Sequence, residues 1–409
     1  MTTQPDPALG VPGPSDSASH DPAVVFVDSY SWQSFADLAG ALRHRGIPAA
    51  RITGRAASPR QRAVMALESL VYGPSVQLVD GGALAGRPAT ISPGALAMAV
   101  GPTTRDVQMQ DDLVIPALDS GPCAANPLRR VAPGVDPMVL VDKRLQEESA
   151  RHAGVPVPES WPTRETAQLP AVVKPAVGFG GDDVTVVHDA DALDRAWREV
   201  VAKHGRPPVV QRLLAQGMST AGVATHGEPV LLVSYQGTPA SDDPTGPSES
   251  IVAVRDDVAD RLARDFLADL GYTGIFCIDW ARDADGGLRL IDFNARAFGS
   301  WVGLQDLGFD VVGAYLYVLG LGPRPDGPEG VYGEERSMLR YPCPAGLDLA
   351  GVRAWRRTSV DIIRTRRAYL GGRWAGVMRL RTEIGTLRAA LRRLLSRRPR
   401  PEAMDDDAA

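Results

Sequence analysis

Lysine is almost absent from this chain. Of its 44 lysine and arginine residues, only Lys143, Lys174 and Lys203 are lysines, and the other 41 are arginines. A bias this strong is explained most simply by codon usage in a GC-rich genome. A lysine kept against it is a candidate for a task that needs a compact ammonium, because a planar guanidinium cannot replace that point charge.

Cysteine is scarce too, and long hydrophobic runs are missing. Cys123, Cys277 and Cys343 are odd in number, far apart and outside any CxxC pattern, which argues against a disulfide framework or a zinc site. No apolar run reaches the roughly 18 residues that a spanning helix needs, and neither end carries a signal peptide or lipidation motif. We therefore expect buried thiols in a cytoplasmic protein without a membrane span.

Size and charge narrow the class of protein further. With 409 residues, 44% hydrophobic and 23% charged, the chain is ordinary globular protein and too long for one core, so two or three units sharing a cleft are expected. A formal net charge of -5 argues against nucleic acid as a partner. A homodimer is possible, because dimers are the commonest assembly of cytosolic proteins.

The first third of the chain predicts a parallel α/β unit. Residues 1–22, rich in Pro, Ser, Asp and Gly, are expected to be a disordered tail. From residue 23, short apolar runs alternate with helical patterns at 31–46 and 58–73, which predicts βαβαβ. The turn after the first strand contains no glycine, so a dinucleotide fingerprint is missing. We expect a Rossmann-like domain over 23–138 that does not bind NAD.

The middle of the chain predicts an α+β unit. Residues 139–142 are expected to be a strand end that runs into a helix stopping at Gly154. A strand, a Gly-rich loop and a second strand follow from Ala171, and a hairpin is predicted to turn at His226-Gly227. Strands at 274–281 and 288–296 flank a tight turn at 285–287.

The end of the chain, residues 346–409, is rich in arginine and helical in period before an acidic terminus. An amphipathic helix with a solvated basic face is the simplest interpretation. Contact with a membrane surface, a partner or RNA stays open as an alternative.

Three oxygen-bearing side chains occur on the last pair of predicted strands. Asp292 and Asn294 are two residues apart and so share one face of their strand, while Asp279 lies on the partner strand. Converging carboxylate and amide oxygens suit a hard cation such as Mg²⁺, which keeps its other positions for water and phosphate. Taken alone, the pattern is equally explained by solvated carboxylates at strand ends.

A glycine-rich turn follows the strand that ends at Lys174. Gly178, Gly180 and Gly181 would let backbone N–H groups close on a phosphate. No GK[ST] follows, and the loop leads to a strand rather than a helix, so it is neither a Walker loop nor a dinucleotide fingerprint. A plain hairpin turn also accounts for these glycines when they are considered alone.

Together, these features resemble the ATP-grasp superfamily in order and spacing: Lys143 at a helix start, Lys174 before a Gly-rich hairpin, the strand 209–214, and the cluster Asp279, Asp292, Asn294 and Arg296. The resemblance covers residues 140–319 and is most similar to carboxylate-amine ligases, including L-amino-acid ligases. It implies a Rossmann-like pre-ATP-grasp domain, then a two-lobed ATP-grasp domain over 139–345 (lid lobe 139–214, metal-binding lobe 215–345), then the basic helical region 346–409.

The resemblance implies ATP as cofactor, with Mg²⁺ or Mn²⁺. Lys143 and Lys174 would hold the phosphates, and the loop with Gly178, Gly180 and Gly181 would close over them as a lid. The nucleotide base would face the backbone of one strand, and Ile291 or Leu290 would pack against its ring. The residues of that strand are Gln211, Arg212, Leu213 and Leu214. Asp279, Asp292 and Asn294 would hold the metal.

The resemblance also implies catalytic and substrate positions. Arg296, together with Lys174, would stabilise the transferring phosphoryl group and the acyl phosphate. The substrate pocket would be lined by Arg296, Gly299, Ser300 and Arg255, of which only Arg296 rests on a motif. Arg255 is explained as well by a surface position.

Two positions depart from the family pattern. Ser219 stands near the place where many members have an acidic residue for the ribose hydroxyls, and Arg212 stands where a glutamate is usual. The expected activity is joining a small-molecule carboxylate to an amine through an acyl phosphate, with release of ADP and phosphate. The alternatives are a non-catalytic ATP-binding module that acts through a partner, and a kinase or carboxylase relative with a different acceptor.

Overall fold

The computed structural model describes residues 22–28, 33–53, 66–68, 75–77, 100–110, 126, 128–178, 183–238, 248–327, 329–339, 343 and 347–396. Within these ranges the chain is a mixed α and β protein, as the sequence predicts. Its strands form three sheets. The domain boundaries expected at 138/139 and 345/346 stay predictions, and the N-terminal tail and acidic end lie outside the described residues.

The first sheet is parallel and has the strand order β3-β2-β1-β4. Its elements are β1 (Val24–Asp28), α1 (Gln33–His44), β2 (Ala49–Thr53), β3 (Ser75–Gln77) and β4 (Asp106–Met109). Every residue of β1 is buried, as expected where a parallel sheet is covered on both faces. The predicted parallel βαβ start is therefore present, although the helix expected at 58–73 lies mostly outside the described residues.

The second sheet has six strands in the order β13-β12-β9-β10-β11-β14. Their bounds are β9 (Ala215–Thr225), β10 (Glu228–Thr238), β11 (Ser250–Val254), β12 (Gly274–Arg282), β13 (Leu288–Asn294) and β14 (Glu335–Ser337). The predicted turn at His226-Gly227 is confirmed, and both residues have positive φ, 49° and 86°, which glycine accepts without strain. Helix α7 (Asp257–Leu270) packs on one face of this sheet.

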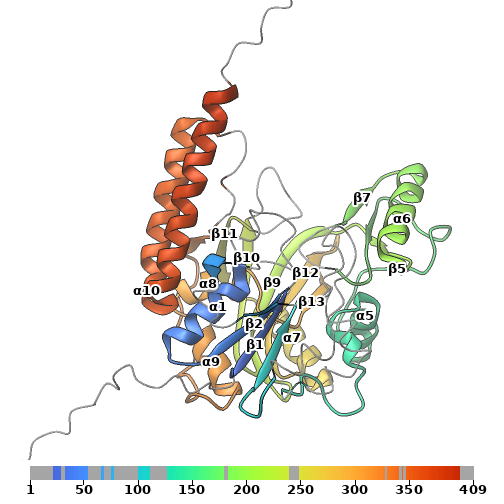
Figure 1. Ribbon diagram of the computed structural model, residues 1–409. Helices are drawn as coiled ribbons and strands as arrows, with labels where there is room; N and C mark the ends of the chain where they lie inside the picture. The colour runs from blue at the N-terminus through green and yellow to red at the C-terminus, as the bar shows by residue number, and fades with distance from the viewer. Residues whose placement is uncertain are drawn as a thin grey trace, which may run out of the picture.

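The third sheet, β5-β8-β6-β7, forms a small lobe with helix α6 at the edge of the molecule (Figure 1). Its elements are β5 (Ser160–Trp161), β6 (Ala171–Lys174), β7 (Thr185–Val187), α6 (Ala190–His204) and β8 (Val209–Arg212). Trp161, Val173, Leu193 and Val210 make up part of its own hydrophobic core. This lobe delivers Lys174 and the adjoining loop to the rest of the protein.

Helix α5 (Lys143–His152) follows a short 3₁₀ helix, η1 (Pro137–Leu140). The expected strand end at 139–142 was therefore wrong. Pro137 pre-sets a helical φ at the start of η1, and the Asp136 side chain caps it by accepting from the Met138 N–H. These local signals outweigh the apolar character of the segment.

The C-terminal helix α10 (Leu349–Ser396) is broken at Gly371, where φ is 80° and ψ is 156°. Its two halves run side by side as a helical hairpin (Figure 1). The helical nature of this region is thus as predicted. Helices α8 (Trp301–Asp306) and α9 (Val311–Val318) share one hydrophobic core with α1, α10 and one face of the six-stranded sheet.

The second half of α10 packs directly on α1. The indole N–H of Trp374 donates to the Asp37 carboxylate at 2.6 Å, and Arg381 donates to Gln33 at 2.7 Å. A Cβ at Gly40 would lie 3.0 Å from the Trp374 ring. The end of the chain therefore completes the packing of its first helix.

We expect Asp37→Asn to flatten the pH dependence of stability. Burial raises the pKa of Asp37 from 3.8 to about 6, against the field of Arg366. Because the folded pKa lies above the unfolded one, the stability contributed by protonated Asp37 is full below pH 4 and is lost as pH rises through 6. About two pKa units correspond to up to about 3 kcal/mol. Asparagine keeps an acceptor for Trp374 without the charge.

Urea unfolding of both proteins from pH 4 to pH 7 tests this expectation. The unfolding free energy of the wild type should fall relative to that of Asp37→Asn as pH rises from 4 to 7. Parallel curves for the two proteins would contradict it.

No helix among the described residues is long and apolar enough to cross a membrane. Of the cysteines, Cys277 is buried and Cys343 is half-buried, and both are free thiols. Cys123 lies outside the described residues.

Candidate active site

Four side chains form one row across the six-stranded sheet. The strand register places Tyr235 opposite Ser219, Ser219 opposite Asp279, and Asp279 opposite Asp292. Cross-strand partners project from the same face of a sheet, so the two carboxylates lie next to each other. The Ser219 hydroxyl donates to Asp279 Oδ1 at 2.6 Å.

Both site lysines are buried beside these carboxylates. Lys143 Nζ lies 3.1 Å from Asp292 Oδ1 and also donates to the carbonyl of Gly178 at 3.0 Å. Lys174 Nζ donates to the carbonyl of Ile291 at 2.7 Å. Strand β6 and the start of α5 thus bring two ammonium groups to one place beside strand β13.

The charges at this place shift one another's pKa. Burial raises the pKa of Asp279, and the nearby charge of Asp292 raises it further. Burial alone would raise the pKa of the half-buried Asp292, but Lys143 and Lys174 lower it below its ordinary value. Burial lowers the pKa of Lys174 to about 8, with Lys143 acting in the same direction and Asp292 against it. The lysines hold Asp292 as an anion while Asp279 is left short of positive charge.

Asn294 and Arg296 lie on the same side of this group. Asn294 Nδ2 donates to Asp279 Oδ2 at 3.2 Å, and its Oδ1 accepts from Arg296 Nη2 at 2.7 Å. Arg296 is only 5% exposed. The structure therefore brings together Lys143, Lys174, Asp279, Asp292, Asn294 and Arg296.

The donor set fits a magnesium ion. Two carboxylates and one amide supply oxygens, and the raised pKa of Asp279 beside Asp292 marks a place where added positive charge is favourable. Asn294 could contribute its oxygen only after its amide turns away from Arg296. The described residues contain no cluster of three or more His, Cys, Asp and Glu side chains suited to a metal.

The strand expected to face the nucleotide base is β8 with the residues after it. Gln211 is buried and its amide donates to Glu147, whereas Arg212 is exposed and pairs with Glu159 at 2.7 Å. Leu213 and Leu214 are half-buried at the end of the strand. Ile291 is half-buried on β13 and binds Lys174 through its carbonyl. The roles of these residues toward ATP stay predictions.

Several other expected positions have distinct surroundings. Ser219, the candidate for ribose binding, is directed at Asp279. Gly178 is tied to Lys143, while Gly180 and Gly181 lie outside the described residues. The Arg255 guanidinium stacks over the Tyr332 ring at 4.1 Å, and no described contact connects it to the carboxylates.

Ser300 is in a hydrogen-bonded chain with Tyr235 and Cys277, which were not predicted as site residues from the sequence. Its hydroxyl lies 2.5 Å from the hydroxyl of Tyr235, which also lies 3.4 Å from Cys277 Sγ. Burial raises the pKa of both Tyr235 and Cys277 well above their ordinary values, so both stay neutral. Cys277 Sγ in turn lies 3.6 Å from Asp279 Oδ1, and Gly299, next to Ser300 in the chain, is exposed.

Helix α5 contributes two more unexpected residues. The side-chain amide of Gln146 makes both hydrogen bonds with the Phe293 backbone, at 2.9 and 3.2 Å. Glu147 accepts from Ser160 at 2.7 Å and from Gln211. The helix that begins with Lys143 is thereby fixed both to the carboxylate strand and to the small lobe.

No protein-family model and no curated protein matches the sequence. Solved structures do match. N5-carboxyaminoimidazole synthetase from Staphylococcus aureus has a TM-score of 0.53 at 12% identity, over 75% of this chain and 79% of that chain. L-amino acid ligase from Bacillus licheniformis has a TM-score of 0.54 at 14% identity, over 74% and 75%.

A third match is the biotin carboxylase domain dimer of 2-oxoglutarate carboxylase from Hydrogenobacter thermophilus, in complex with MgADP, ADP and bicarbonate. Its TM-score is 0.56 at 13% identity, over 76% of this chain and 73% of that chain. Identities this low concern the fold and leave substrates open. At that level the chain has the fold of these enzymes, which is the fold that the resemblance to the ATP-grasp superfamily predicts.

Proposed function

We propose that this protein is an ATP-dependent ligase that activates a small-molecule carboxylate as an acyl phosphate and joins it to an amine. The observation that carries the proposal is the convergence of two buried lysines, two carboxylates, one amide and one arginine at a single place in the fold. The acid and amine are most simply amino acids or small natural-product precursors.

The chemistry requires charge neutralisation more than acid-base catalysis. A carboxylate does not acylate an amine in water because its leaving group is poor, and phosphorylation supplies a better one. Phosphoryl transfer in turn depends on positioning and on offsetting negative charge. Lys143, Lys174 and Arg296 supply three cationic groups around the two carboxylates of the site.

Asp279, Asp292 and Asn294 would hold magnesium. When bound, the ion supplies charge neutralisation on the β- and γ-phosphates. Lys143 and Lys174 would bind phosphate oxygens beside it, and Arg296 would donate to the transferring group. The part of the small lobe that follows Lys174 would keep water from the acyl phosphate.

The close pair of half-buried carboxylates supports catalysis over a binding-only module. Asp279 is desolvated next to Asp292, which is costly unless a cation joins them. A module that only held a nucleotide for a partner would have no need for this pair. The expectation of a homodimer stays a prediction.

A carboxylase-type reaction is the second candidate. The biotin carboxylase domain among the structural matches was solved with bicarbonate as well as MgADP, and bicarbonate can serve as the acid in the same activation step. The two candidates differ only in which acid and acceptor fill the cleft.

Phosphate release tests both candidates together. Purified protein with ATP and Mg²⁺ is incubated with pools of amino acids and amines, with and without bicarbonate, and products are identified by mass. We expect phosphate release matched by a product lighter than its two precursors by one water. Release only with bicarbonate would favour the carboxylase type. Retention of ATP without release in any pool would overturn the ligase proposal.

A further inference from the structure

Arg296 lies on a segment that has no regular structure of its own. Strand β13 ends at Asn294, and helix α8 begins at Trp301, so residues 295–300 are held by neither a ladder nor a helix. The hydrogen bond between the guanidinium and Asn294 does not fix the backbone that carries Arg296. Contacts from other parts of the protein must therefore hold the backbone of residues 295–300.

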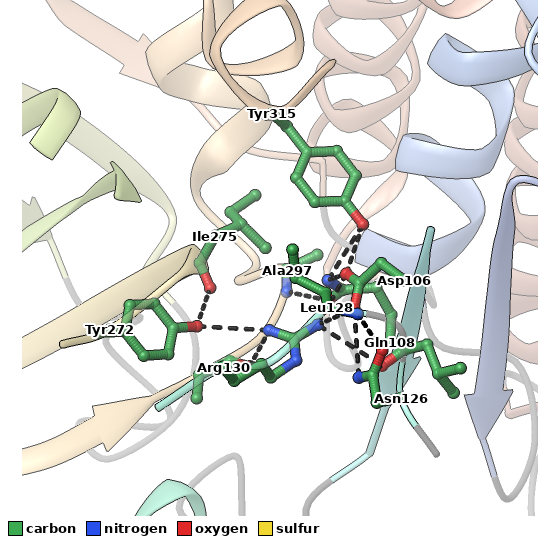
Figure 2. A network of polar contacts seen from close by, with 11 residues as sticks. Asp106, Gln108, Asn126, Leu128, Arg130, Tyr272, Ile275, Ala297 and Tyr315 are labelled. Carbon is green, nitrogen blue, oxygen red and sulfur yellow. Dashed lines mark hydrogen bonds and ion pairs between the residues drawn. The ribbon is translucent and has the colours of Figure 1, made fainter. Parts of the chain in front are cut away.

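The peptide groups on both sides of Arg296 are bound by side chains from elsewhere. The carbonyl of Ala295 accepts from Arg130 Nη1 at 3.0 Å. The N–H of Ala297 donates to Gln108 Oε1 at 3.0 Å. Gln108 belongs to β4 of the parallel sheet, more than 180 residues earlier in the chain, and Figure 2 shows both side chains reaching the segment.

The orientation of Gln108 leaves its oxygen only one use. Its Nε2 donates to Asp106 Oδ2 at 2.5 Å and to the Tyr315 hydroxyl at 3.2 Å. Because the amide nitrogen is committed to these acceptors, Oε1 must point the other way, toward Ala297.

Asp106 is the centre of the network and is fully buried. Both of its oxygens lie 2.7 Å from Arg130 Nη2, and it also accepts from Tyr315 at 2.6 Å and Asn126 at 3.3 Å. Arg130 is held further by the Tyr272 hydroxyl, which donates in turn to the carbonyl of Ile275 on β12. A carboxylate with this many donors is rigid as well as satisfied (Figure 2).

We infer that Gln108 and Arg130 are positioning residues that clamp the backbone on both sides of Arg296 and so set where its guanidinium meets the reacting groups. The inference rests on the proposed function of Arg296. The clamp would make the parallel sheet contribute to the reaction, because strand β4 of that sheet carries Asp106 and Gln108. Neither Gln108 nor Arg130 touches the reacting groups itself.

Gln108→Met is the informative variant. Methionine has a similar length and removes the acceptor for the Ala297 N–H, whereas removing Asp106 or Arg130 would leave a buried charge unpaired and endanger folding. Thr104→Val is the matched control. Thr104 is also buried next to β4 and loses two hydrogen bonds, to Gly101 and Pro22, but it does not contact the segment 295–300.

Amide hydrogen exchange, read by mass spectrometry on peptides covering 295–300, tests the clamp without any need for turnover. We expect faster exchange in Gln108→Met and unchanged exchange in Thr104→Val. Equal protection of this segment in Gln108→Met and the wild type would overturn the inference.

Kinetics test the link to Arg296. Gln108→Met should lower kcat by about 10- to 100-fold, as expected for a small misplacement of a catalytic group, with the Kd for ATP within about twofold. In an Arg296→Ala background, Gln108→Met should lower kcat little further, because it acts through the Arg296 guanidinium, which that background already lacks. A loss repeated in full in that background would overturn the inference.

Failure of the proposed function is distinguishable from failure of the clamp. A wild-type protein that turns over no substrate in any pool counts against the ligase, and the exchange experiment then decides on the clamp alone.

Discussion

Replacing Asp292 by asparagine is expected to lower kcat by at least about 100-fold, the scale found when one preorganised charge is removed from an active site. Asp292 pairs with Lys143 and lies opposite Asp279 on the neighbouring strand, and Lys143 and Lys174 hold its pKa below the ordinary value although desolvation alone would raise it. Asparagine keeps the shape but not the charge. Two ammonium groups would then lack their anion, and the proposed metal site would lose one of two carboxylates.

The control for this variant is Asp285→Asn in the same hairpin. Asp285 is exposed in the turn between β12 and β13, so the same chemical change should leave kcat within about twofold. Circular dichroism and thermal unfolding show whether each variant stays folded. Near-normal turnover in folded Asp292→Asn would remove Asp292 from the active site.

Lys174→Met is expected to lower kcat/KM for ATP by at least about 100-fold, and Lys174→Arg should restore little of it. Lys174 is 6% exposed and its ammonium fits against the carbonyl of Ile291 at 2.7 Å. A guanidinium is larger and planar, and would have to displace β13 to occupy this place. Steady-state kinetics with ATP as the varied substrate gives the comparison.

Lys203→Arg is the matched control for Lys174→Arg. Lys203 is the third lysine of the chain and pairs with Asp183 at 2.6 Å on the surface, where arginine can make the same pair. Its activity should stay within about twofold of the wild type. If Lys174→Arg were equally active, a compact ammonium would not be needed at position 174.

The scarcity of lysine pointed to residues that the structure brings together. Two of three lysines, Lys143 and Lys174, lie beside Asp292 in the structure. Most helices and strands after residue 170 were also predictable, because their apolar period and their turn residues agree. The strand expected at 139–142 failed because capping by Asp136 and Pro137 favours a 3₁₀ helix.

Which side chains share the row of the site could not be read from strand spacing. Counting back from the turn between β12 and β13 pairs Asp279 with Ile291, but an irregularity between Asp279 and Trp280 shifts the register and pairs it with Asp292. A similar shift near Pro229 places Tyr235, rather than Ser234, opposite Ser219. One extra residue reverses the face. Pro229 is a local signal for the second shift, because proline inside a strand is typical of bulges, but no local signal marks the shift between Asp279 and Trp280.

The network around Asp106 was equally out of reach for sequence reasoning. Gln108 and Ala297 are 189 positions apart, and a lone Asp-Val-Gln on a short strand carries no motif. Only the packing of the parallel sheet against the segment after β13 gives these residues a meaning.

The contact between α1 and α10 has a consequence for the order in which the protein is made. Trp374 reaches Asp37 across 337 positions, and the core shared by α1, the six-stranded sheet and α9 also includes Leu370 and Met378. A nascent chain emerging from a ribosome cannot cover α1 until about residue 378 has left the exit tunnel. The small lobe around β6 and α6 has its own core and can fold far earlier. The lobe that carries Lys174 can thus be folded before α10 covers α1.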